Sequence, residues 1–136
     1  MHHVEINYFA VLLSGVLAMV IGSLWYGPLF GKTWMKEEGF TEEDLTKDFN
    51  SAKTYGLTFI AALVVVYVLA RILGYIGAEG IVEGLRVAFL CWLGFIAATK
   101  MTNYLFERKT LKLFLINAFY HLVNLLIASV ILSVWK

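Results

Sequence analysis

The chain has 136 residues, a formal net charge of +1 and one cysteine. Hydrophobic residues make up 60% of it and charged residues 15%, with a mean hydropathy of +0.76. Soluble domains average about 45–50% apolar and about 25% charged residues, so the composition indicates a membrane protein. The small net charge offers no bulk attraction to nucleic acid. Because Cys91 is the only cysteine in the sequence, an internal disulfide is excluded.

Four apolar segments are each long enough to cross about 30 Å of hydrocarbon, which takes about 20 helical residues. They are Val4–Tyr26, Ala52–Tyr75, Gly84–Phe106 and Leu111–Trp135. The first has no basic stretch before it and no small-residue cleavage site, so we expect a retained helix rather than a signal peptide. The predicted fold class is all-α: residues 1–136 form a single integral membrane domain, a four-helix transmembrane bundle of two antiparallel helical hairpins.

The first loop is expected to follow Pro28, because proline ends a helix. Beside it, Trp25 and Tyr26 are aromatic residues of the kind found at a headgroup boundary, and Tyr104 is interpreted in the same way near the end of the third helix. Within the loop, Thr41 can cap a short amphipathic helix over residues 42–49. We expect that helix to lie on the membrane surface or against the bundle.

Basic residues in the loops predict the orientation in the plasma membrane. Seven lie in loops one and three, and three lie on the opposite side: Lys32, Lys36, Lys47, Lys53, Arg108, Lys109 and Lys112 against Arg71, Arg86 and Lys136. By the positive-inside rule, loops one and three are cytoplasmic and both termini lie outside.

Two parts of the chain share a short sequence similarity, which we call the internal echo. Residues 26–34 and 104–111 each end an apolar helix, and each begins with tyrosine and contains Leu-Phe followed by a basic residue and threonine. Two tandem hairpins related by an axis along the membrane normal would generate this echo. Chance similarity over so few residues is the alternative.

The fourth segment carries a polar stripe, formed by Asn117, His121 and Asn124 at i, i+4 and i+7. Lys100 and Asn103 begin a similar line in the third segment. In an antiparallel hairpin turning near Lys109 the two lines can face each other. Polar residues at membrane depth need partners or water, so these five residues form the predicted polar intramembrane site.

The sequence allows several roles for Lys100 and several for His121. A lysine at the centre of a membrane helix costs about 2.5–3.5 kcal/mol, nearly all that the apolar residues around it contribute. Lys100 therefore extends toward the interface, pairs within a polar cavity, or acts as a catalytic amine. His121 is a neutral imidazole bonded to its neighbours, a proton or ion relay, or a haem ligand that would need a second histidine from another subunit.

Small residues indicate where helices pack closely in lipid. They are Gly15, Ala18 and Gly22 in the first segment and Thr58 in the second. No intramembrane carboxylate pair, Ser/His/Asp set, phosphate loop or HExxH motif is present in the sequence. We therefore predict no catalytic residue, metal site or cofactor, and the sequence leans against an enzyme.

Several strings resemble a known family in the family's own order. They are residues 22–35, 40–45, 92–95, 102–103, 105–107 and 112–122. They are similar to the prokaryotic membrane proteins called the Domain of Unknown Function 1761 family. The resemblance implies a four-helix integral membrane protein and implies no activity. It also implies a small neutral residue where this chain has Lys100, so a role for Lys100 would be particular to this protein.

The sequence favours a small transport-type protein with a polar site between the third and fourth helices. The alternatives are a non-catalytic accessory or scaffold subunit, and then a haem- or quinone-associated subunit that uses His121. A bundle this small has little interior, so we expect a homo-oligomer or other membrane subunits as partners, besides the lipid bilayer.

Overall fold

The computed structural model describes residues 5–39 and 51–135. Every regular element within those ranges is helical: α1 Tyr8–Leu24, α2 Gly31–Glu38, α4 Ser51–Ile76, α5 Gly80–Cys91, α6 Ala98–Glu107 and α7 Leu111–Val134. The surface helix predicted over residues 42–49 lies outside the described residues.

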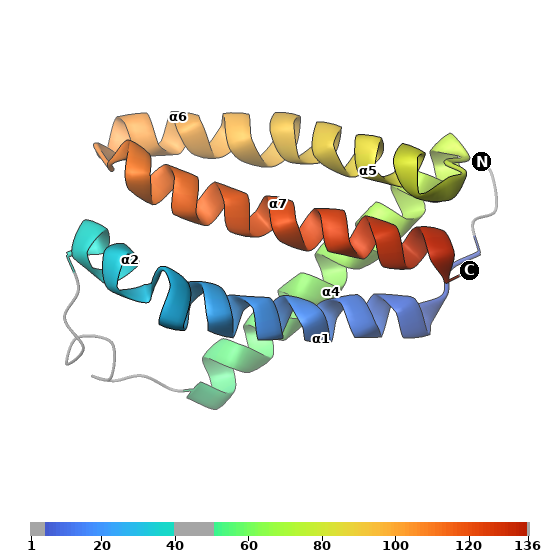
Figure 1. The fold of residues 1–136 in the computed structure, drawn as a ribbon, viewed down its shortest axis with the longest axis horizontal. Helices are drawn as coiled ribbons and strands as arrows, with labels where there is room; N and C mark the ends of the chain where they lie inside the picture. Colours follow the sequence, from blue (N-terminus) through green and yellow to red (C-terminus); the bar gives the residue numbers. More distant parts are fainter. Residues whose placement is uncertain (1–4, 40–50, 136) are drawn as a thin grey trace.

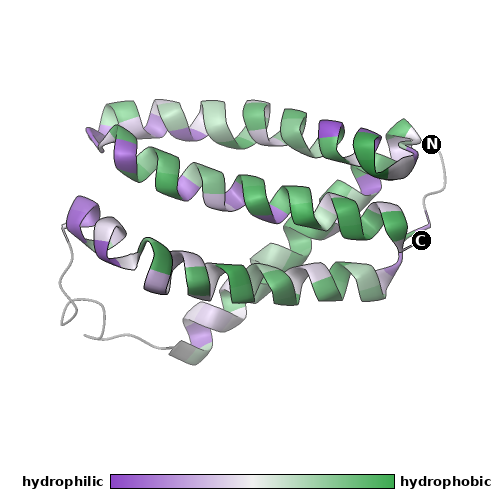
Figure 2. Cartoon of the chain, in the orientation of Figure 1, coloured by the Kyte–Doolittle hydropathy of each residue, from purple (hydrophilic) through white to green (hydrophobic). Residues whose placement is uncertain are grey.

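The described chain has four stretches long and apolar enough to cross a membrane, as in a multi-pass membrane protein. They are Tyr8–Leu29, Ala52–Ile76, Gly80–Glu107 and Leu111–Val134. Figure 2 shows these helices hydrophobic over most of their length, with hydrophilic residues on α2, near the turn between α6 and α7, and at a few places along α7. This distribution suits a bundle whose middle lies in hydrocarbon and whose ends reach water.

The first spanning stretch does not run directly into a loop at Pro28. The helix passes into a π-helical turn, Trp25–Leu29, that contains the proline, and the backbone kinks at Gly27 (φ −106°, ψ −105°). It then continues as α2, a helix that the sequence interpretation missed because proline normally ends one. α2 is joined to the α6–α7 turn by an ion pair between Glu38 and Lys109 (3.3 Å).

The third spanning stretch is continuous from α5 through α6. It begins at Gly80, four residues before the predicted start at Gly84, and a π-helical segment over Trp92–Ala97 joins the two helices. A π-helical segment adds residues to a turn and so changes which side chains face the neighbouring helix. The two π-helical segments of the described chain thus begin at Trp25 and at Trp92.

α7 is the helix around which the others pack. It contacts α5 and α1 most extensively, and also α2, α4 and α6. In Figure 1, α5 and α6 run along one side of α7, α1 runs along the other, and α4 crosses obliquely behind them. Buried apolar residues from α1, α4, the third spanning stretch and α7 form the core, among them Val11, Leu69, Trp92, Ala118 and Leu125.

Replacing Gly31 with alanine should destabilise the fold. An added Cβ would lie 2.5 Å from the backbone carbonyl oxygen of Tyr26, which cannot move without disturbing the kink. We expect Gly31→Ala to cost about 1–3 kcal/mol, seen as a lower unfolding midpoint of the detergent-solubilised protein. The control is Gly56→Ala in α4, where the added Cβ meets nothing within 4 Å. Equal midpoints for the two variants would contradict the close contact.

Candidate functional site

Asn117 is the most highly connected residue of the predicted polar site. The Tyr26 hydroxyl donates to its Oδ1 at 2.6 Å, and its Nδ2 donates to the Tyr104 hydroxyl. Tyr26 comes from the kink after α1 and Tyr104 from α6. The Asn117 side chain on α7 therefore joins three elements that are far apart in the sequence.

Two tryptophans bind the backbone of the same turn of α7. The Trp25 indole donates to the Ile116 carbonyl oxygen at 2.9 Å, and the buried Trp92 indole donates to the Ala118 carbonyl oxygen at 2.6 Å. A helical carbonyl has a second lone pair free for such a bond, and an indole N–H in an apolar surrounding needs an acceptor. We call Trp25, Tyr26, Trp92 and Tyr104 the aromatic clamp.

The clamp is the feature that sequence reasoning missed. Trp25, Tyr26 and Tyr104 were expected to be interface anchors, and Trp92 was given no role. One signal could have pointed to them: an intramembrane asparagine such as Asn117 needs both donors and acceptors, and tyrosine hydroxyls near helix ends supply both.

Lys100 and His121 lie close to each other on facing helices. The charge of Lys100 acts electrostatically on His121. The His121 ring also lies against that of Tyr120, with ring centroids 5.2 Å apart. Among residues 5–39 and 51–135, no hydrogen bond or ion pair is made by Lys100 or by His121.

Asn103 is not brought into this group. The face of the third spanning stretch that packs on the core includes Ala97, Met101 and Tyr104. One residue advances about 100° around a helix, so Asn103 lies about that far from Tyr104 and its side chain is exposed.

Two buried polar atoms lack partners in the described part of the chain. They are Oδ1 of Asn124 on α7 and Oγ of Ser14 on α1. Asn7 donates to the Trp135 carbonyl (3.1 Å), and Tyr120 donates to the Ala18 carbonyl (3.1 Å). These contacts set an antiparallel register that places Ser14 and Asn124 within about one helical turn of the same depth.

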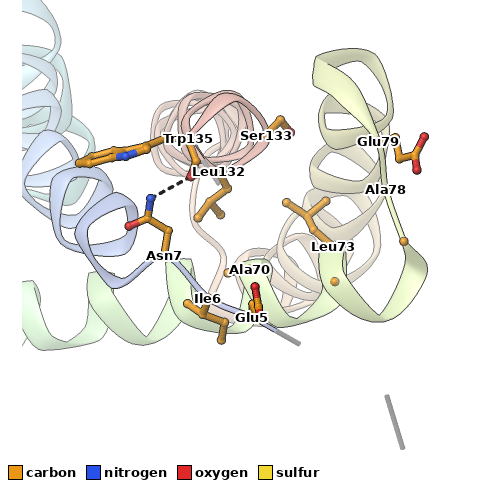
Figure 3. A pocket seen from close by; sticks show the side chains of 12 residues that line it. Glu5, Ile6, Asn7, Ala70, Leu73, Ala78, Glu79, Leu132, Ser133 and Trp135 are labelled. Carbon is orange, nitrogen blue, oxygen red and sulfur yellow. Dashed lines mark hydrogen bonds between the residues drawn. The ribbon is translucent and has the colours of Figure 1, made fainter. Parts of the chain in front are cut away.

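A cavity of about 590 Å³ lies at the end of the bundle where α7 finishes. Its lining comes from the stretch before α1, the end of α4 with the following turn, and the end of α7. Figure 3 shows the side chains of Glu5, Asn7, Glu79 and Ser133 among those around it, and the bond from Asn7 to Trp135 at its edge. The cavity thus lies at one end of the α1–α7 contact, opposite the aromatic clamp.

The predicted helix-packing residues occupy different surroundings. Gly15 packs against Leu63 and Phe59 of α4, and Gly22 lies next to the Tyr120 hydroxyl. Ala18 is buried. Thr58 is exposed, and its hydroxyl donates to the Thr54 carbonyl in its own helix at 2.7 Å. Within the residues that the structure describes, no group of three His, Cys, Asp or Glu side chains could hold a metal ion.

The family described as "Protein of unknown function (DUF1761)" matches residues 9–133. The chain belongs to the DUF1761 family. No curated protein and no solved structure matches it significantly. Membership of DUF1761 confirms the resemblance seen in the sequence, and the family's description assigns no activity.

Removing either tyrosine hydroxyl of the clamp should destabilise this DUF1761 protein. Tyr26→Phe or Tyr104→Phe leaves one polar atom of Asn117 without its partner, which we expect to cost about 1–2 kcal/mol. The measurement is the unfolding midpoint in detergent. Tyr8→Phe is the matched control, because Tyr8 is 67% exposed. If all three variants unfold at the same temperature, the bonds to Asn117 do not hold α7 in place.

Proposed function

We propose that this protein is a small transport-type membrane protein whose polar interior, along α7, admits water and a small polar or ionic solute. The observation that carries the proposal is the pair of buried, unpartnered atoms, Ser14 Oγ and Asn124 Oδ1. Leaving a buried polar atom without a partner costs about 1–3 kcal/mol. Such atoms are therefore normally bonded to an ordered water or a ligand.

The two ends of the α1–α7 contact support this proposal in different ways. At one end lies the cavity bordered by Asn7 and Ser133. At the other end the hydroxyls of Tyr26 and Tyr104 close over Asn117. We propose that the interior beside Ser14 and Asn124 opens into this cavity and is closed at the clamp in a resting state, because a path open at both ends would leak.

We further propose the arrangement in the plasma membrane that the loop charges predict. The helices form two antiparallel hairpins, loops one and three are cytoplasmic, and both termini lie outside. The cavity beside Glu5 and Glu79 then opens to the outside, and the clamp lies toward the cytoplasm. Since one copy encloses little space, a second copy or another membrane subunit completes the path.

The test is the reactivity of single cysteines with a membrane-impermeant, water-soluble thiol reagent, in a Cys91→Ala background. A thiol reacts as its thiolate, which forms only where water reaches it. We expect Ser14→Cys and Asn124→Cys to react in membranes. Leu90→Cys is the control and should not react, because Leu90 is 65% exposed on an apolar helix face that lipid would cover.

Two further positions test the orientation in the same experiment. In intact cells Glu79→Cys should react, whereas Lys109→Cys should react only after the membrane is opened. The opposite pattern would reverse the topology. If Ser14→Cys and Asn124→Cys both stay inert while Glu79→Cys reacts, the interior is dry and the transport proposal fails.

A non-catalytic accessory or scaffold subunit is the second candidate. It is favoured by the bonding of Asn117, whose oxygen and nitrogen each have a tyrosine partner. In such a subunit the polar residues would serve only to hold helices together. A dry interior, together with purification from native membranes in a fixed ratio with other subunits, would support it over transport.

A further inference from the structure

An apolar groove of about 260 Å³ lies between α4 and the third spanning stretch. Val64, Val68 and Ile72 of α4 form one wall, Cys91 and Phe95 form part of the other, and Leu125 of α7 lies with them in the lining. α4, which forms one side of the groove, crosses the other helices obliquely rather than running alongside them (Figure 1).

Two basic residues of the predicted polar site, Lys100 and His121, lie close to residues of the groove lining along their helices. Ile96 lines the groove, and Lys100 follows it by four residues on the same helical stretch; Leu125 lines it, and His121 precedes it by four residues. Residues four apart lie on the same side of an α-helix, which holds for His121 and Leu125 in α7; Lys100 lies in α6, just after the π-helical segment that contains Ile96. Lys100 and His121 therefore lie about one turn from these lining residues, on the side of the α6–α7 turn.

Lys100 has no carboxylate partner among residues 5–39 and 51–135. The ionisable group that it is shown to act on is His121, a second base that cannot balance its charge. Lys100 also lies only about 10 Å of helical rise from Glu107 at the end of α6. Its ammonium group can therefore extend toward a headgroup while its stem stays in apolar surroundings.

We propose that this groove binds a membrane phospholipid with an anionic head group. One acyl chain occupies the space between α4 and the third spanning stretch, and the phosphate pairs with Lys100. Charge complementarity selects the anionic head. The wholly apolar lining and the exposed Phe95 (75%) and Val68 (46%) at the groove select a lipid over a soluble anion. This site is separate from the proposed solute interior and does not depend on it.

The test is native mass spectrometry of the full-length protein with phosphatidylglycerol or phosphatidylcholine of the same acyl chains. We expect phosphatidylglycerol to stay bound preferentially. Lys100→Gln should reduce that preference about fivefold, the factor expected for one lysine at an anionic lipid surface. Val68→Trp should displace both lipids by filling the groove.

The matched controls are Lys112→Gln, which removes an exposed cation near the same end of the bundle, and Leu90→Trp, which enlarges an exposed side chain outside the groove. Neither should change lipid retention. Equal binding of the two lipids, or equal effects of Lys100→Gln and Lys112→Gln, would overturn the pairing with Lys100. Unchanged lipid retention in the Val68→Trp variant would overturn the proposal that an acyl chain binds in the groove. Matching unfolding midpoints show that each variant is folded.

Discussion

The arrangement of the bundle depends on the hydrogen bonds that one turn of α7 makes with aromatic side chains of other helices. Two indoles bind the carbonyls of Ile116 and Ala118, and two tyrosine hydroxyls bind the Asn117 side chain between them. In hydrocarbon an unsatisfied polar group costs several kcal/mol. These bonds therefore fix both the depth and the rotation of α7, and with them the positions of His121 and Asn124.

This fixed rotation gives α7 two different surfaces, one for each of the proposals made above. Toward α1, the orphaned atoms of Asn124 and Ser14 define the interior that we propose to be hydrated. Toward α4, Leu125 lines the apolar groove of the proposed lipid site. His121 lies between the two surfaces, one turn from Leu125 and close to Asn124 on the same stripe. The proposed solute path and the proposed lipid site would thus share one helix without sharing their lining.

Much of this could be predicted from the sequence, because helix geometry alone sets the spacing of Asn117, His121 and Asn124. The aromatic clamp could not. An aromatic residue at a helix end is typical of a membrane interface, and nothing in its spacing indicates that Tyr26 bonds to Asn117 of α7. The internal echo had aligned Tyr26 with Tyr104, and the two share Asn117 as partner. Asn103 shows a different limit of the pattern, because its spacing suits a stripe whereas α6 packs on the core through Met101 and Tyr104.

The most direct test of a hydrated interior is a crystal structure in a lipidic phase at a resolution that shows ordered water. The account predicts a water molecule bonded to Asn124 Oδ1 or to Ser14 Oγ, within the packed α1–α7 pair. A direct hydrogen bond from Ser14 to Asn124, with no water beside either atom, would contradict it.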